Sequence, residues 1–422
     1  MTHPVFDYVN GMLHAEGIPT DKLAKHFGTP LYIYSRAALT TAYKAYTQAC
    51  EGRRAAIHVA VKANSNLGVL NVFARLGAGF DIVSGGERAR VLAAGGKAKN
   101  VVFSGVGKSA EEMRMALQAG VKCFNVESLP ELDRLNAVAG LLRKRAPVSL
   151  RVNPDIGPKT HPYISTGLKA NKFGVAFAES RSSYRAAGAL PNLQVVGIDC
   201  HIGSQITELS PHLDALDKVL DLVEQIEADG IPIHHINIGG GLGITYADET
   251  PPTIGDFVAA VFGRLDARGH GQREVYFEPG RSLTGNAGIL LTRVEFLKPG
   301  EEKNFAIVDA AMNDLARPAT YEAYHAIVPV KEQSGHASAV YDVVGPVCES
   351  GDWLGRERTL AIAPGELLAI RSAGAYGFVM SSNYNTRPRA AEVLVDGANA
   401  YLVRARETIE SLLGGEAILP DS

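Results

Sequence analysis

Over residues 55 to 281, short apolar runs alternate with stretches in which apolar residues recur at helical spacing. The expected strands, in chain order, are Ile57–Ala63, Phe80–Ser84, Val101–Ser104, Cys123–Glu127, Val148–Asn153, Gly197–Gly203, His235–Gly240 and Val275–Glu278. With the helical patterns between them they make eight β–α units, and that count favours a (β/α)8 TIM barrel, an α/β fold. A doubly wound open sheet is the competing arrangement for the same alternation.

Two of the expected helices begin with a capping-box sequence, in which a glutamate follows a serine by three residues. The two pairs are Ser109 with Glu112 and Ser128 with Glu131. After the fifth strand, the connection Pro154–Gly174 is unusually long. Loops of this length are often functional, and a simple surface excursion is the equal alternative.

After residue 282 the pattern changes to strands separated by turns, with few helices between them. The expected strands are Ile289–Phe296, Phe305–Asp309, Ala339–Val344, Leu367–Ser372, Glu392–Val395 and Tyr401–Arg404. This pattern indicates a second domain, a β-barrel or a sandwich, which a strand at Leu31–Tyr34 would join. We therefore expect a barrel domain over residues 37–282 and a β domain made of residues 1–36 and 283–422.

The composition fits a globular protein with two cores. The chain has 422 residues, of which 46% are hydrophobic and 21% charged. A net charge of -3 gives no reason to expect a nucleic-acid partner. The first residues lack a basic segment followed by an apolar run, and no apolar run approaches the length of a membrane helix. We expect neither a secretory signal nor a membrane partner.

The cysteines and histidines indicate no metal site. Cys50, Cys123, Cys200 and Cys348 are scattered along the chain, and the histidines show no spacing typical of metal ligands. We therefore expect no bound metal. Scattered cysteines fit a reducing compartment, and the cytoplasm is the expected location.

Polar residues gather at the carboxyl ends of the expected strands, where TIM barrels carry their catalytic groups. Lys62 lies near the end of the first strand, an apolar run in which its side chain would be poorly hydrated. Desolvation lowers the pKa of a lysine and suits the amine to Schiff-base formation with a carbonyl. A lysine that merely extends out of the sheet to water is the structural alternative.

Further polar groups follow the second, sixth and seventh strands. Asp81 lies near the end of the second strand, and His201 and Ser204 end the sixth. The glycine run 239–241 ends the seventh strand and allows backbone N–H groups to approach an anion such as phosphate. A tight turn is the simpler explanation for the glycines, and a structural role is the simpler one for a lone histidine.

Glu278 ends the eighth strand and is followed by Gly280 and Arg281. A carboxylate there can keep a pyridine nitrogen protonated, which makes a cofactor ring an electron sink. A structural ion pair between Glu278 and Arg281 is the alternative. His201 could stack on such a ring or act as an acid–base group. One cofactor, pyridoxal 5'-phosphate (PLP), accounts for the lysine, the glycines, the carboxylate and the histidine together.

Over nearly its whole length the chain resembles the fold-type III PLP-dependent decarboxylases, and within them the branch that acts on diaminopimelate. The likeness rests on short segments whose order and spacing are specific in combination. These segments are residues 59–64, 79–87, 201–205, 239–241, 278–281, 345–352 and 374–377.

The resemblance implies that Lys62 holds PLP as a Schiff base, that His201 stacks on its ring and that Glu278 faces the pyridine nitrogen. Phosphate contacts are implied for Ser204, for the glycine run and the Gly280–Arg281 backbone, and for Tyr376. The cofactor-binding residues expected are Lys62, Asp81, His201, Ser204, Gly239, Gly240, Gly241, Glu278, Gly280, Arg281 and Tyr376.

The resemblance also implies a substrate site and an assembly. The substrate-binding residues expected are Arg281, Arg317, Tyr321, Glu349 and Tyr376. Cys348 matches the cysteine that protonates the product carbanion in this family. That cysteine lies on the β domain and completes the active site of the other subunit, so a homodimer is the expected working unit.

The implied activity is decarboxylation of meso-2,6-diaminopimelate to L-lysine and CO2, the last step of lysine biosynthesis by the diaminopimelate route. Unless it is merely a surface cation, Arg317 can offer a bidentate fork to the second carboxylate of this substrate, and Glu349 can pair with its second ammonium. Residues 163–174 and 348–350 also look like this branch.

Two alternatives remain open on the sequence. One is decarboxylation of a related amino acid, namely ornithine, arginine or carboxynorspermidine. The other is a non-catalytic PLP-fold protein that acts as a binding regulator. Such regulators typically lose the lysine or the cysteine, and this chain has both Lys62 and Cys348.

Overall fold

The structure is a computed structural model that describes residues 5–157, 171–332 and 335–420. The chain divides into two compact units. One is Leu39–Thr284, and the other joins Met1–Ala38 to Gly285–Ser422. None of the helices in the described ranges combines the length and the apolar character needed to cross a membrane.

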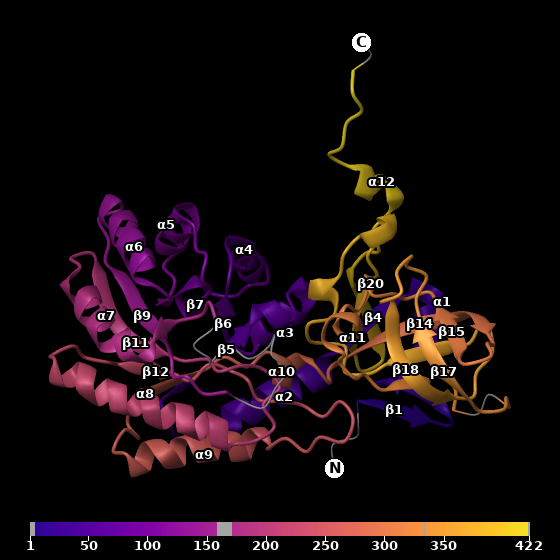
Figure 1. Cartoon of the computed structure of the whole chain (residues 1–422), viewed down its shortest axis with the longest axis horizontal. Helices are drawn as coiled ribbons and strands as arrows, with labels where there is room; N and C mark the ends of the chain where they lie inside the picture. Colours follow the sequence, from indigo (N-terminus) through magenta and orange to yellow (C-terminus); the bar gives the residue numbers. More distant parts are fainter. Residues whose placement is uncertain (1–4, 158–170, 333–334, 421–422) are drawn as a thin grey trace. The chain divides into compact units, whose positions relative to one another are not determined.

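In the described part of Leu39–Thr284, eight parallel strands close into a barrel (Figure 1). Around the barrel they are β5 (Ala55–Ala60), β6 (Gly79–Ile82), β7 (Val101–Phe103), β8 (Cys123–Val126), β9 (Ala146–Asn153), β11 (Leu193–Asp199), β12 (His235–Asn237) and β13 (Glu274–Phe277). The pairing of β8 with β9 and of β13 with β5 completes the ring. The predicted TIM barrel is confirmed, and the open doubly wound sheet is wrong.

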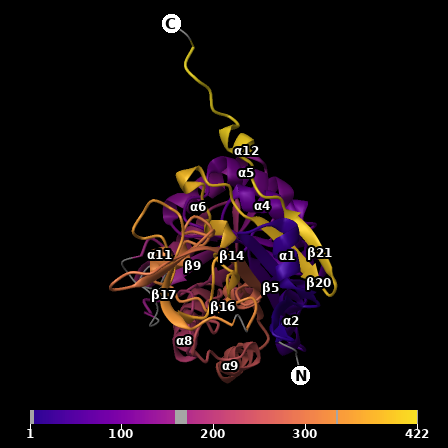
Figure 2. The same ribbon diagram turned by 90° about the vertical axis from the view of Figure 1, so that its right-hand side faces the viewer.

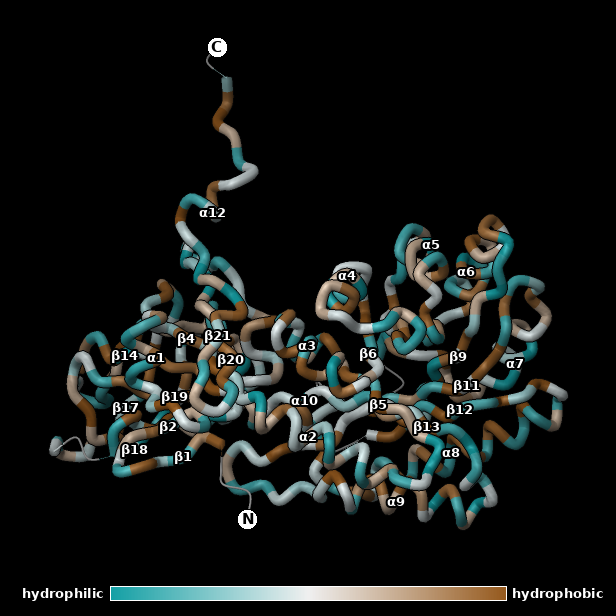
Figure 3. The backbone as a smooth tube through the Cα atoms, turned by 180° about the vertical axis from the view of Figure 1, so that it is seen from behind, coloured by the Kyte–Doolittle hydropathy of each residue, from teal (hydrophilic) through white to brown (hydrophobic). Residues whose placement is uncertain are grey.

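Helices cover the outside of the barrel. They are α2 (Arg36–Ala49), α3 (Leu67–Arg75), α4 (Gly85–Ala93), α5 (Ala110–Ala119), α6 (Leu129–Leu141), α7 (Phe177–Ala189), α8 (Ser210–Ala228) and α9 (Ile254–Ala267), with the short α10 (Arg281–Thr284) after the last strand. Figure 3 shows hydrophobic and hydrophilic residues mixed along these helices. Their buried apolar faces, such as Phe257, Val261 and Leu265 on α9, pack inward because burial of apolar surface stabilises the fold.

The two predicted capping boxes differ in the structure. At α5 the box is complete, since Ser109 and Glu112 each accept a hydrogen bond from the other's backbone N–H. At α6 only half of the box forms. Ser128 accepts from the Glu131 backbone, but the Glu131 carboxylate accepts from Glu127 N–H and pairs with Lys108. The Glu131 carboxylate, which the motif assigns to the cap, therefore pairs with the buried Lys108 ammonium instead.

In the barrel unit, several strands are shorter than predicted, and one strand was missed. β5 ends at Ala60, and Lys62 lies in the 3-10 turn η1 (Val61–Ala63) that follows it. β10 (Val175–Ala176) pairs with β9 just after the long connection and was not predicted. Residues 158–170 of that connection, including most of the segment that looked specific for the substrate, lie outside the described residues.

The other unit is a mixed β-sheet domain with a small N-terminal sheet. β1 (Phe6–Val9), β2 (Met12–Ala15) and β3 (Ile18–Pro19) form the small sheet, followed by α1 (Thr20–Phe27). The larger sheet contains β4 (Leu31–Ser35), β14 (Gly288–Lys298), β15 (Asn304–Val308), β16 (Ile327–Pro329), β17 (Ala339–Val344), β18 (Trp353–Leu360), β19 (Leu367–Ile370), β20 (Ala391–Asp396) and β21 (Asn399–Arg404). Two short helices, α11 (Arg317–Tyr321) and α12 (Ile409–Leu413), complete the unit.

Strand β4 lies at the centre of this larger sheet. It pairs antiparallel with β14 and parallel with β20, and all five of its residues are buried. Beyond β20, the hairpin partner β21 forms an edge of the sheet (Figure 2). The prediction that Leu31–Tyr34 joins the β domain is therefore confirmed, whereas β16 and β18 were missed.

Candidate active site

Lys62 and Asp81 meet at the carboxyl end of the barrel. The Nζ atom of Lys62 lies 3.2 Å from Oδ2 of Asp81, whose carboxylate is fully buried. The Lys62 side chain keeps 35% of its surface exposed, so the prediction of a poorly hydrated lysine embedded in a strand is wrong. The lysine stands in a turn at the barrel mouth, with its ammonium next to a buried anion.

Glu278 directly follows β13 and is buried beneath that mouth. Its Oε1 accepts from Nδ2 of Asn237 at 2.5 Å and from Nδ2 of Asn125 at 3.4 Å. Burial raises the pKa of Glu278 well above its usual range, and the nearby carboxylates of Asp81 and Asp199 raise it further, while Lys62 opposes the shift. The site therefore favours a proton on this carboxyl group until a basic partner takes it.

A second buried polar group surrounds Arg151 on β9. Its Nη1 lies 3.3 Å from Oε1 of Glu127, and its Nη2 donates to the carbonyl of His201 at 3.3 Å. Burial raises the pKa of Asp199, with Arg151 opposing and Glu127 adding to the shift. Arg151 thus offsets acidic groups inside the barrel and anchors the backbone at His201.

The glycine run meets His201 at the barrel mouth. Gly240 N–H donates to Nδ1 of His201 at 3.3 Å, and Gly239 N–H donates to Oδ1 of Asn237 at 2.9 Å. A Cβ atom at Gly240 would lie 2.2 Å from the carbonyl oxygen of Glu278, so only glycine fits there. Burial, and then the charges of Lys62 and Arg151, hold the pKa of His201 well below its usual range, which leaves its imidazole neutral.

Arg281 begins α10 and its side chain is buried. Its Nε and Nη2 donate to the hydroxyl of Ser204 at 3.1 and 3.0 Å, and its Nη1 donates to the hydroxyl of Tyr246 at 2.5 Å. The predicted alternative, a structural ion pair with Glu278, is therefore not the contact that holds this guanidinium. Arg281 ties the loop after β11 to the loop after β13.

In the other unit, Arg317 is a buried cation and not a surface one, with 6% of its surface exposed. Its Nη1 lies 2.8 Å from Nε2 of His325, whose Nδ1 lies 2.8 Å from the carbonyl of Arg371. A carbonyl can only accept, so His325 is protonated on Nδ1 and accepts the Arg317 hydrogen at Nε2. Tyr321 ends the same short helix and is half-buried.

The loop between β17 and β18 carries Cys348 and Glu349, which are both exposed. Asp352 shapes this loop, since its two oxygens accept from the backbone N–H groups of Met312 at 2.6 Å and Val347 at 2.7 Å. The backbone N–H of Cys348 donates to Oδ1 of Asn385 at 2.9 Å. The cysteine is thus presented on a loop whose backbone is tightly held.

Tyr376 follows β19 and is half-buried, with a backbone φ of +54°. Residues other than glycine rarely adopt this left-handed conformation, and such backbone strain often occurs at functional sites.

Among the described residues, the predicted site positions fall into two sets. Lys62, Asp81, His201, Ser204, residues 239–241, Glu278, Gly280 and Arg281 belong to the barrel, and Arg317, Tyr321, Cys348, Glu349 and Tyr376 to the β unit.

Sequence reasoning missed the residues that hold the predicted ones. Asn125, Asn237 and Arg151 are buried, and Tyr246 binds the guanidinium of Arg281. A usable signal existed for the asparagines, because each is a polar residue within a short, buried strand. Since successive strand residues alternate between faces, such a residue points either into the barrel or toward the covering helices, and both places are dry.

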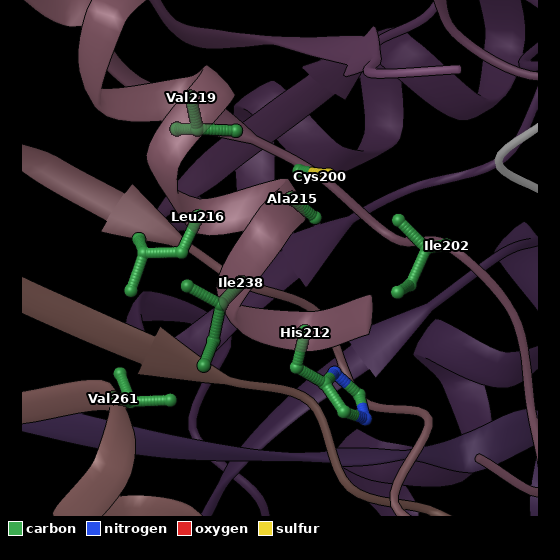
Figure 4. Close-up of a pocket in the computed structure, with 8 residues that line it drawn as sticks. All are labelled: Cys200, Ile202, His212, Ala215, Leu216, Val219, Ile238 and Val261. Carbon is green, nitrogen blue, oxygen red and sulfur yellow. The ribbon is translucent and has the colours of Figure 1, made fainter. Parts of the chain in front are cut away.

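A small apolar cavity lies behind the glycine run, between β11, β12 and the helices α8 and α9 (Figure 4). Its volume is about 10 Å³, room for about one water molecule. His212 lines it, and a Cβ atom at Gly241 would lie 3.1 Å from the His212 ring. This cavity is too small for a substrate and belongs to the packing behind the site.

Comparisons with known proteins identify the family of this chain. Residues 36–285 match the family described as "Pyridoxal-dependent decarboxylase, pyridoxal binding domain". The chain is 58% identical to a diaminopimelate decarboxylase of Pseudomonas aeruginosa, over 98% of this chain and 99% of that one. It is 57% identical to the Vibrio cholerae protein of the same name, over 98% and 100%.

Solved structures give the same result. The structure of diaminopimelate decarboxylase from M. jannaschii with L-lysine has a TM-score of 0.94 and 38% identity, covering 99% of this chain and 98% of that one. The Helicobacter pylori enzyme with L-lysine has a TM-score of 0.89 and 39% identity, covering 93% and 98%. With a barrel whose mouth carries a lysine, a glycine run and a buried glutamate, the chain belongs to the diaminopimelate decarboxylase family of pyridoxal-dependent decarboxylases.

Proposed function

We propose that this chain decarboxylates meso-2,6-diaminopimelate to L-lysine and CO2 with PLP as cofactor, the last step of lysine biosynthesis by the diaminopimelate route. The observation that carries the chemistry is that one barrel mouth holds both Lys62, paired with Asp81, and a buried Glu278 held by two amides. The full-length similarity to diaminopimelate decarboxylases supports the substrate.

The residues at the barrel mouth fit PLP. The Oδ1 atom of Asp81 is buried and has no hydrogen-bond partner among the described residues, and a buried acceptor of this kind is costly unless a ligand satisfies it. Gly240 lies against the Glu278 backbone with no room for a side chain. An amine, a buried carboxyl group and a close-packed glycine turn are the donor set that an aldehyde, a pyridine nitrogen and a phosphate require.

When bound, PLP supplies a ring that accepts the electrons released as the carbon–carboxylate bond breaks. In our proposal Lys62 holds the cofactor through Nζ, and Asp81 keeps that atom in place. His201, neutral and fixed by Gly240 N–H, offers a flat uncharged face for stacking. Glu278 shares its proton with the ring nitrogen, for which its raised pKa prepares it.

Phosphate binding is proposed for Ser204, for residues 239–241, for the Gly280–Arg281 backbone and for Tyr376. Ser204 already accepts two hydrogen bonds from Arg281, which leaves its own hydroxyl hydrogen to donate. The positive charge of Arg281 beside this hydroxyl favours an anion there. We also propose that Arg281 contributes to substrate binding.

Substrate binding is further proposed for Arg317, Tyr321, Glu349 and Tyr376. Arg317 is buried and its Nη1 is aligned by His325, so its guanidinium is preorganised for a carboxylate. Glu349 is exposed on the Cys348 loop, where it can meet an ammonium. A hydrogen bond to Glu349 raises the pKa of Tyr384, which places this tyrosine beside the same carboxylate.

Cys348 is proposed as the proton donor to the product, and the working unit as a homodimer. The cysteine is exposed on its own unit, as a group that serves another subunit must be. In this arrangement Cys348 would complete the active site of the partner subunit. The proposal rests on the family resemblance and on this exposure.

The test is product analysis after incubation with meso-diaminopimelate, with and without PLP. L-lysine and CO2 should appear only with PLP, and Arg317→Leu should lower kcat/KM about a hundredfold, because the distal carboxylate loses a charged partner. The control is Arg356→Leu, which removes an exposed arginine stacked on Trp353 and should leave the rate unchanged. Equal turnover of ornithine, or full activity of Arg317→Leu, would contradict the proposed substrate.

A further inference from the structure

Asn237 closes a ring of three hydrogen bonds between two parts of the site. Its Oδ1 accepts from Gly239 N–H at 2.9 Å, and its Nδ2 donates to Oε1 of Glu278 at 2.5 Å. The Glu278 N–H then donates to the carbonyl of Gly239 at 2.7 Å. All three residues are buried, and Asn237 has no exposed surface. One amide therefore joins the glycine turn to the glutamate.

The orientation of this amide has one solution. A backbone N–H can only donate, so the Asn237 atom that faces Gly239 must be the oxygen, and Nδ2 must face Glu278. Asn125 donates to the same oxygen of Glu278, and its Nδ2 also donates to the Ser104 hydroxyl at 3.1 Å. Since both amide hydrogens are directed at Oε1, a proton carried by this carboxyl group would lie on Oε2.

The backbone geometry shows how little freedom this arrangement allows. Gly239 has a φ of +67°, and a Cβ atom there would lie 2.7 Å from the carbonyl oxygen of Cys200. A Cβ atom at Gly240 would lie 2.2 Å from the Glu278 carbonyl oxygen. The glycine turn and the strand end that carries Glu278 are thus in direct contact, and the Asn237 ring fixes their spacing.

We propose that Asn237 is a positioning residue that fixes both ends of the cofactor with the two ends of one amide. Its oxygen sets the glycine turn at the phosphate, and its nitrogen holds Oε1 of Glu278, which leaves Oε2 to face the ring nitrogen. The inference rests on the proposed function, because it takes PLP as the ligand. The pyridine ring of PLP is rigid and its phosphate arm is short, so the two contacts must stay within a narrow range of separation to act together.

The two ends can be tested separately with apo-protein titrated by PLP and by pyridoxal, which lacks the phosphate. The ratio of the PLP affinity to the pyridoxal affinity measures the phosphate contacts alone. Asn237→Leu should lower this ratio about tenfold, since it frees the glycine turn. The matched control is Asn125→Leu, which removes an amide from Glu278 but has no bond to the turn, and it should leave the ratio unchanged.

The Glu278 end has its own readout. Asn237→Asp keeps an acceptor for Gly239 N–H and replaces the donor to Glu278 by a second carboxyl oxygen. The absorbance of bound PLP should then titrate at a pH shifted by about one unit, while the PLP-to-pyridoxal ratio stays near that of the unaltered protein. The melting temperature of each apo-variant checks the fold.

Three results would overturn the inference. Asn237→Leu could weaken PLP and pyridoxal equally, both asparagine variants could lower the ratio alike, or Asn237→Asp could leave the absorbance titration unchanged. If Asn237→Leu does not fold, the isosteric Asn237→Asp variant still decides through its titration. Failure of the unaltered protein to take up PLP is a different result, which would refute the proposed function itself.

Discussion

The imidazole rings show how environment decides the role of a residue. His58 and His235 are buried in the barrel, and burial lowers the pKa of each to about 3. His212 lines the small cavity of Figure 4 and packs edge-on against Phe257, with 4.8 Å between the two ring centroids. Burial lowers the pKa of His212 to about 4. These rings act as neutral packing groups, whereas His201 lies at the barrel mouth.

His212 should make the protein sensitive to acid. Between about pH 6.5 and 4 the unfolded chain binds a proton that the folded chain excludes, so the free energy of unfolding falls as the pH falls through this window. His212→Leu should reduce the loss between pH 7.5 and 5 by about 2 kcal/mol. Urea unfolding at both pH values measures this.

The control is His234→Gln, which changes an exposed histidine in the same unit. An acid sensitivity that is the same in His212→Leu as in the unaltered protein would show that this ring is not the group responsible. The structure places Lys62 and Glu278 at the barrel mouth, where they were expected because strand ends of a parallel barrel share one face, while their roles stay predictions. Sequence reasoning missed Asn237, because the role of an amide depends on partners that come from a neighbouring strand.

At the level of elements, glycines on two strands make room for rings on their neighbours. Gly197 on β11 is paired with His235 on β12, and Gly79 on β6 is paired with His58 on β5. A Cβ atom at Gly197 would lie 2.2 Å from the His235 ring, and one at Gly79 would lie 2.4 Å from the His58 ring. Interior packing of the barrel thus depends on small residues opposite large ones.

Gly197→Ala should lower the free energy of unfolding by about 1–3 kcal/mol, because the added methyl group overlaps a buried ring. In a His235→Ala background the same change should cost less, and a double-mutant cycle measures the difference. Gly263→Ala, on α9 where nothing lies within 4 Å, should be neutral or stabilising by up to about 1 kcal/mol. Equal costs in both backgrounds would show that the ring is not the obstacle.

Element prediction failed where the local pattern was weak or misleading. β18 carries Arg356, Glu357 and Arg358 in its middle, and this charged run hides the strand that pairs with β17. β16 has three residues and ends in Pro329. β16 is fixed by pairing with β19, a partner distant in sequence, which local periodicity does not record.

At the level of the whole molecule, each unit carries part of the proposed active site. Lys62 and Glu278 belong to the barrel unit, and Cys348 and Arg317 to the β unit. In the proposed homodimer, a complete site takes its groups from two subunits. Loss of one group in each unit should therefore be complementable.

Mixing Lys62→Ala with Cys348→Ala should restore about a quarter of the unaltered activity, since half of the dimers are mixed and each has one complete site. Steady-state assays after demonstrated subunit exchange measure this. Mixing Lys62→Ala with Glu278→Gln is the control, since both changes lie in the barrel unit and every mixed site keeps a defect. Absence of recovery in the first mixture, or recovery in the second, would contradict sites shared between subunits.

The central place of β4 has a consequence for how the chain is made. Residues 31–35 leave the ribosome before the barrel segment, and β14 and β20, between which β4 lies, leave it only after the barrel segment. During translation this apolar segment has no strand partner until the whole barrel segment has been synthesised. Folding of the β unit therefore depends on the residues that are synthesised last. A chaperone that shields exposed strands would have to protect Leu31–Ser35 for the longest time.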